Sequence, residues 1–355
     1  MTAQSDAEQL YADVSGHRPT PPNPDWAGAA PEPVLEPGLP IIDPHHHLWD
    51  RPTQRYMRPE LDADLRAGHD IRATVFMECS AARYLDGPEH LRPVAETVLV
   101  ASQAGPVETG PGRTCEVAAG IVAHADLAHP RLDEVLDAHE RAGAGRFRGI
   151  RHATQTDPRD EAPRVRAMPP GMLNQAPFRA GVARLGARGL SFDAWLYHAQ
   201  VPELTALAHA CPGTTVVLDH VGGVLGLGSY ARERDEVRAA WRRDVAALAA
   251  CPNVVVKLGG MGMIMFGFGF ERHPQPPSST ALAEAWRPFA EPCIELFGAG
   301  RCMFESNFPV DMVSGSYATT WNAFKRLAAG ASAADKAALF AGTAARVYRL
   351  PGIPL

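Results

Sequence analysis

The sequence predicts an α/β protein, a single-domain TIM-like (β/α)₈ barrel, from three observations. From residue 39 onward, short apolar runs alternate with longer segments of helical period. There are eight such runs, which matches a closed barrel better than an open doubly wound sheet. A titratable side chain stands at the end of nearly every run, where the active site of such a barrel lies.

The eight runs are expected to be parallel strands, because they are apolar on both faces and rich in β-branched residues. They cover residues 40–43, 73–79, 117–124, 147–152, 190–198, 214–220, 253–259 and 301–307. The segments between them predict helices within 90–105, 130–143, 178–189, 202–213 and 230–250. The last of these has one apolar face, made by Val237, Trp241, Val245 and Leu248. No glycine-rich dinucleotide fingerprint follows any run, which disfavours a Rossmann fold.

Residues 39–355 are expected to form the barrel, preceded by a Pro-rich N-terminal extension at residues 1–38. Seven prolines between residues 19 and 37 exclude a helix or a central strand there. The extension is therefore expected either to be disordered or to lie extended across the domain or a neighbouring subunit.

Composition and charge narrow the class of protein. The net charge of −6 over 355 residues disfavours nucleic acid as a partner, and no apolar stretch is long enough to span a membrane. The N-terminal residues lack the pattern of a signal peptide, and the six cysteines form no CxxC pair. We therefore expect a cytoplasmic enzyme with reduced thiols that acts on a small molecule, and a homo-oligomer remains open.

The first run ends in three consecutive histidines, which predict a metal site. Alternate side chains of an extended segment share a face, so His45 and His47 point together and His46 points away. With His198, at the end of the fifth run, they can supply three nitrogen ligands to a divalent ion such as zinc, with a position left for water. The alternative is that these histidines hydrogen-bond to the backbone and the protein works without metal.

Other polar residues at the run ends are candidates for substrate binding. Glu78 and Lys257 can hold substrate or pair with charges inside the barrel, and Arg151 and His152 can grip a carboxylate. Trp49 can stack on a ring. After the seventh run, residues 259–270 are rich in Gly, Met and Phe, which indicates either an adaptable apolar wall for a substrate with an apolar portion or a buried loop.

The runs carry motifs that resemble a known family. They are IIDPHHHLWD, TVFMECS, GIVAHADL, GIRH, FDAWLYHAQVPEL, VVLDHVGG, NVVVKLGG and RCMFESNFPVD. In this order they are similar to the amidohydrolase-related branch of the amidohydrolase superfamily, which includes sugar lactonases, pyrone-dicarboxylate lactonases and sulfomuconolactone hydrolases. The resemblance spans roughly residues 38–350. It implies a distorted barrel that opens cyclic esters with an activated water, with one divalent ion in some members and none in others.

Carried over position by position, the resemblance implies site roles for His45 and His47 in the first strand, His198 in the fifth and His220 in the sixth. The eighth strand departs from the family. Where the family has Ser-Asp-Trp-Pro, with the Asp as general base, this chain has Asn307, and an amide cannot accept a proton near neutral pH.

The missing aspartate leaves the identity of the general base open. Glu305, two residues before Asn307, and Asp311, in the following loop, are the nearest carboxylates. His152 and His220 are alternatives, because imidazole titrates near neutral pH.

Three functions follow from this pattern. The motif series favours a hydrolase that opens a lactone or a related cyclic ester. Asp43, two residues before His45, fits a metal-dependent decarboxylase of an aromatic or unsaturated acid, although Asn307 fits it poorly. The missing aspartate also leaves open a non-hydrolytic barrel enzyme such as an isomerase or a cyclase.

Overall fold

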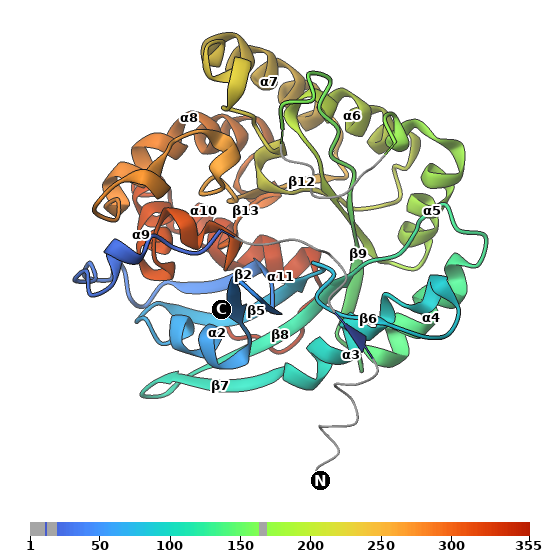
Figure 1. Ribbon diagram of the computed structural model, residues 1–355, viewed down its shortest axis with the longest axis horizontal. Helices are drawn as coiled ribbons and strands as arrows, with labels where there is room; N and C mark the ends of the chain where they lie inside the picture. Colours follow the sequence, from blue (N-terminus) through green and yellow to red (C-terminus); the bar gives the residue numbers. More distant parts are fainter. Residues whose placement is uncertain (1–10, 13–19, 163–168) are drawn as a thin grey trace.

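In the computed structural model, residues 11–12, 20–162 and 169–355 are described. Eight parallel strands form an inner ring and helices surround it (Figure 1). The strands are β2 (Pro40–His46), β5 (Asp70–Met77), β8 (Arg113–Ala123), β9 (Phe147–Ala153), β10 (Ser191–Trp195), β11 (Val216–Leu218), β12 (Val254–Leu258) and β13 (Cys302–Phe304). Each of the eight runs contains or overlaps one of these strands, which confirms the predicted (β/α)₈ barrel.

The strands pair in sequence order from β2 to β13, and the ring closes just beyond the last strand. There, Asn307 N–H donates to the His45 carbonyl oxygen at 2.9 Å, and His47 N–H donates to the Phe308 carbonyl oxygen at 2.8 Å. These two bonds fix the segment after β13 against the histidine run of β2. The closure therefore positions parts of the predicted site directly.

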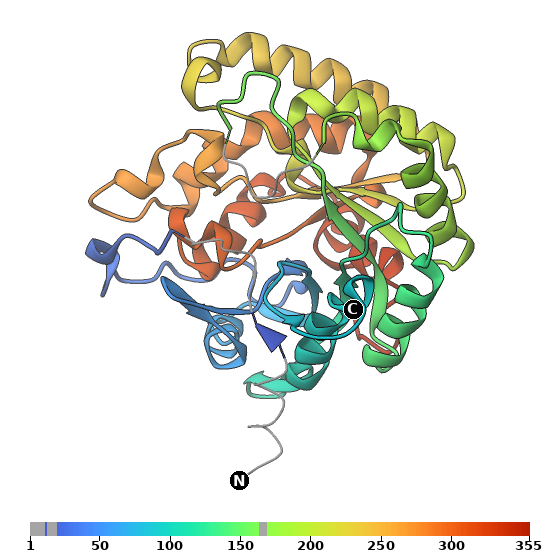
Figure 2. The same cartoon turned by 45° about the vertical axis from the view of Figure 1, so that its right-hand side comes forward.

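The helices return the chain between strands, as the turned view in Figure 2 also shows. They are α2 (Arg58–Leu65), α3 (Val94–Gln103), α4 (Leu132–Ala142), α5 (Ala176–Ala187), α6 (Val201–Ala210), α7 (Arg234–Ala249), α8 (Ser279–Phe297), α9 (Tyr317–Leu327), α10 (Ala333–Ala337) and α11 (Thr343–Val347). The predicted apolar face of α7 is buried in full. Among the described residues, no helix is both long and apolar enough to cross a membrane.

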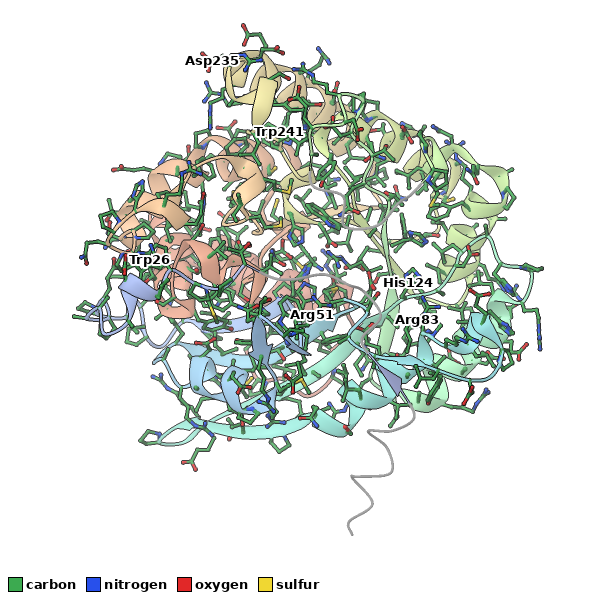
Figure 3. All side chains as sticks on the ribbon, viewed as in Figure 1. Trp26, Arg51, Arg83, His124, Asp235 and Trp241 are labelled. Carbon is green, nitrogen blue, oxygen red and sulfur yellow. The ribbon has the colours of Figure 1, made fainter. Side chains whose placement is uncertain are left out.

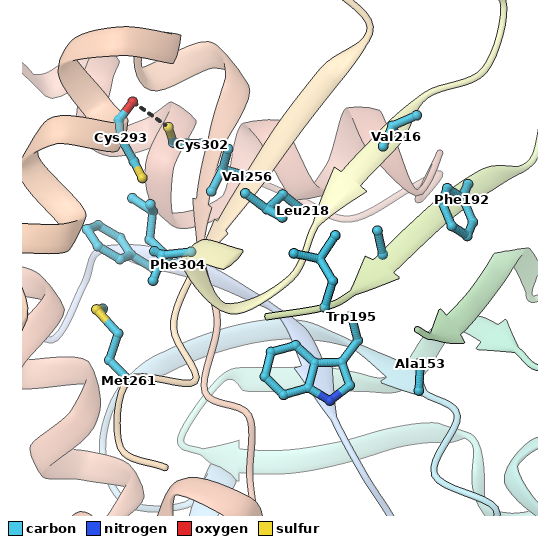
Figure 4. Packing of buried hydrophobic residues seen from close by; sticks show 14 of the residues in the cluster. Ala153, Phe192, Trp195, Val216, Leu218, Val256, Met261, Cys293, Cys302 and Phe304 are labelled. Atoms are coloured by element: carbon cyan, nitrogen blue, oxygen red, sulfur yellow. Dashed lines mark hydrogen bonds between the residues drawn. The ribbon is translucent and has the colours of Figure 1, made fainter. Parts of the chain in front are cut away.

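The main core lies between the strands and the helices. Figure 4 shows side chains of β10, β11, β12 and β13 in this layer, among them Phe192, Val216, Val256 and Phe304. All four are fully buried. This apolar layer fixes one side of each strand, so the other side can carry the polar groups of the barrel interior.

Small strands add to the barrel. β7 (Gly105–Gly110) pairs antiparallel with β8, and β3 (Trp49–Arg51) pairs with β4 (Gln54–Tyr56) directly after the histidines. β1 (Tyr11–Ala12) pairs with β6 (Arg83–Tyr84).

Part of the predicted extension lies against the barrel domain. Glu32 accepts hydrogen bonds from the backbone and side chain of Ser279 at the start of α8. Lys325 of α9 donates to the carbonyl oxygens of Leu35 and Glu36 at 2.7 and 2.9 Å. Residues 32–36 therefore lie along α8 and α9, whereas residues 1–10 and 13–19 lie outside the described residues.

Candidate active site

The histidine run at the end of β2 divides as an extended segment requires. The Nε2 atoms of His45 and His47 lie 3.3 Å apart, while His46 faces the opposite way with its Nε2 atom 2.9 Å from the Thr74 hydroxyl. His47 Nδ1 lies 2.9 Å from the carbonyl oxygen of Met77, which can only accept a hydrogen bond. Nδ1 therefore carries the hydrogen, and Nε2 of His47 presents a lone pair toward His45.

The spacing of these two nitrogen atoms fits a shared divalent cation. Two bonds of about 2.0–2.1 Å at a tetrahedral angle place the nitrogen atoms about 3.3 Å apart. Burial holds the pKa values of His45 and His47 well below the usual value, so both imidazoles are neutral, the form that binds a metal. Between the two Nε2 atoms there is room either for a hydrogen donated by His45 or for a cation.

A second group of possible ligands combines His45 with Asp219 and His220. Its Asp219 side is already occupied, because Lys257 Nζ lies 3.1 Å from Asp219 Oδ1 and 3.3 Å from His45 Nδ1. An ammonium group there competes with a metal ion for the same oxygen. The pair of Nε2 atoms of His45 and His47 is thus the better candidate metal position.

Glu305 joins two of the histidines. Its Oε1 lies at a hydrogen-bond distance of 2.6 Å from His220 Nδ1, and its Oε2 lies at an ion-pair distance of 2.6 Å from His45 Nδ1, although out of line for a hydrogen bond. The carboxylate is fully buried, and burial raises the pKa of Glu305 well above its usual value. In the tautomer of His220 whose Nδ1 donates to Glu305, Nε2 is left as an acceptor, the arrangement by which a carboxylate orients a catalytic imidazole.

Two glycines after β12 make room for this pair. A Cβ atom at Gly259 would lie 2.3 Å from Glu305 Cγ, and one at Gly260 would lie 2.3 Å from His220 Nδ1. Gly260 also has a φ of +65°, which side-chain-bearing residues rarely adopt. The glycines at the start of the 259–270 loop therefore serve close packing at the site. Farther along, the rings of Phe266 and Phe268 pack on Phe289 of α8.

Buried charges surround Lys257 at the centre of the barrel. Its Nζ lies 3.0 Å from Asp193 Oδ2 and 3.1 Å from Asp219 Oδ1, and Arg151 Nε donates to Asp219 Oδ2 at 2.9 Å. Burial alone would raise the pKa of Asp219, but Lys257 and Arg151 hold it at about 2. Glu78 lies beside Arg151 at 3.7 Å. The predicted substrate-binding residues Lys257, Arg151 and Glu78 thus pair with charges inside the barrel.

Substituting Lys257 by Met is expected to lower the free energy of unfolding by about 3–5 kcal/mol, because Asp193 and Asp219 would remain buried without their cation. Urea denaturation measures this. The control is Lys336→Met, which removes a surface ion pair with Glu36 and is expected to cost less than about 1 kcal/mol. Equal losses of unfolding free energy in the two variants would show that Lys257 does not stabilise the buried carboxylates.

The hydrogen bonds of the segment after β13 explain why an asparagine fits at position 307, where the family has an aspartate. Asn307 Nδ2 donates to Asp311 Oδ1 at 2.7 Å, and the other oxygen of Asp311 accepts from Gly262 N–H at 2.8 Å. Both oxygens of Asp311 are therefore occupied, and burial raises its pKa well above the usual value. An aspartate at position 307 would set two carboxylates against each other, whereas the amide donates to Asp311. Asp311 is accordingly placed to hold Asn307.

His198 lies apart from the group formed by His45, His47 and His220. Strand β10 ends at Trp195, and His198 begins a 3₁₀ turn (His198–Gln200) three residues later. Its Nδ1 lies 3.4 Å from the backbone nitrogen of Leu225, and its ring contacts Tyr230. Among the described residues, no contact joins it to the facing Nε2 atoms.

The remaining predicted residues flank the histidines. The ring of Trp49 is stacked on His47 with centroids 5.6 Å apart, and the Arg51 guanidinium lies 4.3 Å from its centroid. Trp49 therefore packs between two side chains, which keeps the ring of His47 in place. His152, at the end of β9, contacts His124 at 5.1 Å and lines a hollow beside the site.

The sequence interpretation missed Asp193 and Asp219. Both lie within runs that were recognised as strands. Asp219 directly precedes His220, and Asp193 lies two residues before Trp195 on β10. A charged residue inside an otherwise apolar run was the available signal, because such a residue needs a buried partner.

Comparisons with known proteins show which proteins this chain is similar to. Residues 42–350 match the Amidohydrolase family model. A protein from Sinorhizobium fredii, Uncharacterized protein y4mH, is 32% identical over 87% of this chain and 98% of its own length. L-fucono-1,5-lactonase from Burkholderia multivorans is 30% identical over 87% of this chain and 96% of its own length.

Among solved structures, an amidohydrolase from Burkholderia multivorans with bound zinc is 26% identical to this chain, with a TM-score of 0.66. The match covers 88% of this chain and 99% of that one. The likeness therefore extends over nearly the whole barrel.

Proposed function

The chain belongs to the amidohydrolase family and is a hydrolase, and on that premise we propose that it opens a lactone or a related cyclic ester with an activated water. The observation that carries the proposal is the pair of facing Nε2 atoms of His45 and His47 at the carboxyl end of β2. The lactonase among its relatives supports a cyclic ester as the substrate.

We propose that Nε2 of His45 and of His47 hold a divalent ion, zinc in the first instance. Enzymes of this superfamily usually bind a divalent metal, and the spacing of 3.3 Å suits zinc–nitrogen bonds. Such an ion supplies Lewis acidity, which polarises an ester carbonyl and makes water more acidic. The carbonyl oxygen of Met77 fixes the ring of His47, and Glu305 lies against the Nδ1 atom of His45.

His220 serves as the general base in this proposal, in place of the aspartate that position 307 lacks. Here Glu305 accepts a hydrogen bond from His220 Nδ1, so Nε2 of His220 is free to take a proton from water. As it does so, the water oxygen forms a bond to the lactone carbonyl carbon. When the ring C–O bond breaks, the same Nε2 returns the proton to the departing alkoxide oxygen. Asn307 orients groups through its amide oxygen and moves no proton.

The test is a hydrolysis assay of the zinc-loaded protein with L-fucono-1,5-lactone and other five- and six-membered lactones. Hydrolysis releases acid, which a pH indicator dye in weak buffer measures. We expect turnover of at least one lactone, and loss of that turnover after chelation and dialysis. Release of CO₂ from an aromatic acid, with every lactone left intact, would replace the proposal by a decarboxylase.

A further inference from the structure

We propose that a hollow beside the histidines binds a carboxylate of the substrate, with Arg83 as its charged anchor. This inference rests on the proposed function, because it names which cyclic esters the enzyme accepts: those that carry a carboxylate. The hollow encloses about 280 Å³, close to the lower end of the range for ligand pockets. Its polar lining consists of Ser80, Arg83, Glu96, His124, Asp126 and His152.

The hollow lies on the catalytic face of the barrel. Ser80 follows the end of β5, His124 comes directly after β8, and His152 lies near the end of β9. These are carboxyl ends of three adjacent strands, the face on which the histidines of β2 also lie. Arg151, next to His152, donates to the Glu78 carbonyl oxygen at 3.0 Å and so joins this wall to the charged centre.

A chain of contacts also joins the hollow to the candidate metal position. The Arg51 guanidinium donates to the Cys79 carbonyl oxygen at 2.7 Å, and the same group lies over Trp49, which is stacked on His47. Cys79 is bonded to Ser80 in the chain. Figure 3 shows Arg83 and His124, both of the lining, close together, with Arg51 to one side of them. A substrate held in the hollow is therefore a neighbour of the reacting centre.

Among the described residues, Arg83 brings a positive charge to the hollow that no other side chain neutralises. It is half-buried, and within the described part of the chain its guanidinium forms no ion pair and no hydrogen bond. Of the two acids in the lining, Glu96 is buried and accepts from the backbone of Cys79 and Ala81 through one oxygen. Asp126 is exposed and accepts from Ala128 N–H. A half-buried guanidinium in a cavity is a site for an anion.

The group held in the hollow is expected to be a single carboxylate rather than a phosphate. A guanidinium forms two parallel hydrogen bonds with a carboxylate, and the imidazoles of His124 and His152 add polar surface around it. The carboxylates of Glu96 and Asp126 in the same lining repel a doubly charged phosphate more strongly than a singly charged carboxylate.

The experiment measures binding, so it does not depend on turnover. Isothermal titration with isophthalate, a ring bearing two carboxylates, compares the wild type with Arg83→Gln and Arg83→Lys. Because Arg83→Gln removes the charge-assisted pair between the guanidinium and the carboxylate, we expect it to raise the Kd by about 10–100-fold. Arg83→Lys should recover part of the affinity, since it keeps the charge and loses the bidentate geometry.

The control is Arg141→Gln, at the exposed end of α4, which should bind isophthalate like the wild type. The neutral isophthalamide should bind the wild type and Arg83→Gln equally. Equal affinity of the wild type and Arg83→Gln for isophthalate, or no binding to the wild type, overturns the proposal. Absence of lactone turnover with the expected binding pattern would refute the proposed function and leave the carboxylate site standing.

Discussion

Replacement of His47 by alanine is expected to lower kcat/KM for lactone hydrolysis by about 10²–10³-fold or more, the scale of losing a group that stabilises charge in the transition state. The reason lies in the lone pair that Nε2 of His47 presents 3.3 Å from Nε2 of His45. Without the imidazole of His47, only that of His45 remains of this pair of possible metal ligands. Steady-state kinetics with the lactone that the wild type turns over best gives the measurement.

The histidine run supplies its own control. His46 is adjacent to His47 and equally buried, but it faces Thr74 on the other side of the strand. His46→Asn should therefore change stability more than rate, with kcat/KM within a few-fold of the wild type. Circular dichroism of both variants verifies folding. A folded His47→Ala variant of undiminished activity would remove His47 from the site.

Replacement of Glu305 by glutamine is expected to weaken both metal binding and turnover by about 10–100-fold, as loss of a group that orients a metal-binding or catalytic imidazole does. Both oxygens of Glu305 lie 2.6 Å from a histidine Nδ1 atom. A glutamine offers only one oxygen, and its NH₂ group would face the other imidazole. Glu305 is a positioning residue, and kcat is expected to fall more than KM rises.

The zinc affinity of the folded protein distinguishes a positioning role of Glu305 from a purely structural one, because a loss of stability alone would leave that affinity unchanged. Titration of the metal-free variant with zinc, in competition with a chromophoric chelator, measures it. Glu284→Gln, on the exposed side of α8, is the matched control and should behave as the wild type. Unchanged zinc affinity and kcat in a folded Glu305→Gln would mean that the carboxylate orients neither histidine.

The eight barrel strands could be predicted from the sequence, but the long helix α8 could not, and neither could the shorter α2, α9, α10 and α11. Apolar, β-branched runs mark buried parallel strands, and all eight were found. Helix α8 escaped notice because Pro288 and Pro292 lie inside it, and an interior proline costs about 3 kcal/mol. Burial of residues such as Trp286 and Cys293 offsets that cost. Local sequence carries the penalty of a proline, whereas the compensation comes from tertiary packing.

The directions of the site side chains could be predicted for residues within a strand, where side chains alternate between two faces, but not for residues beyond the end of a strand. Alternation gave the common face of His45 and His47 and the opposite face of His46. It failed for His198, because the fifth run was expected to stay extended to that residue while β10 ends at Trp195. The assignments of metal and substrate contacts remain predictions.

Whether His45 and His47 hold a divalent ion between them is decided by the metal content of the purified protein. Elemental mass spectrometry after loading with zinc and dialysis against metal-free buffer should give about one ion per chain for the wild type and for His46→Asn, and far less for His47→Ala. A wild type without tightly bound metal, or a His47→Ala variant that keeps its full complement, would show that these two histidines do not hold a metal ion.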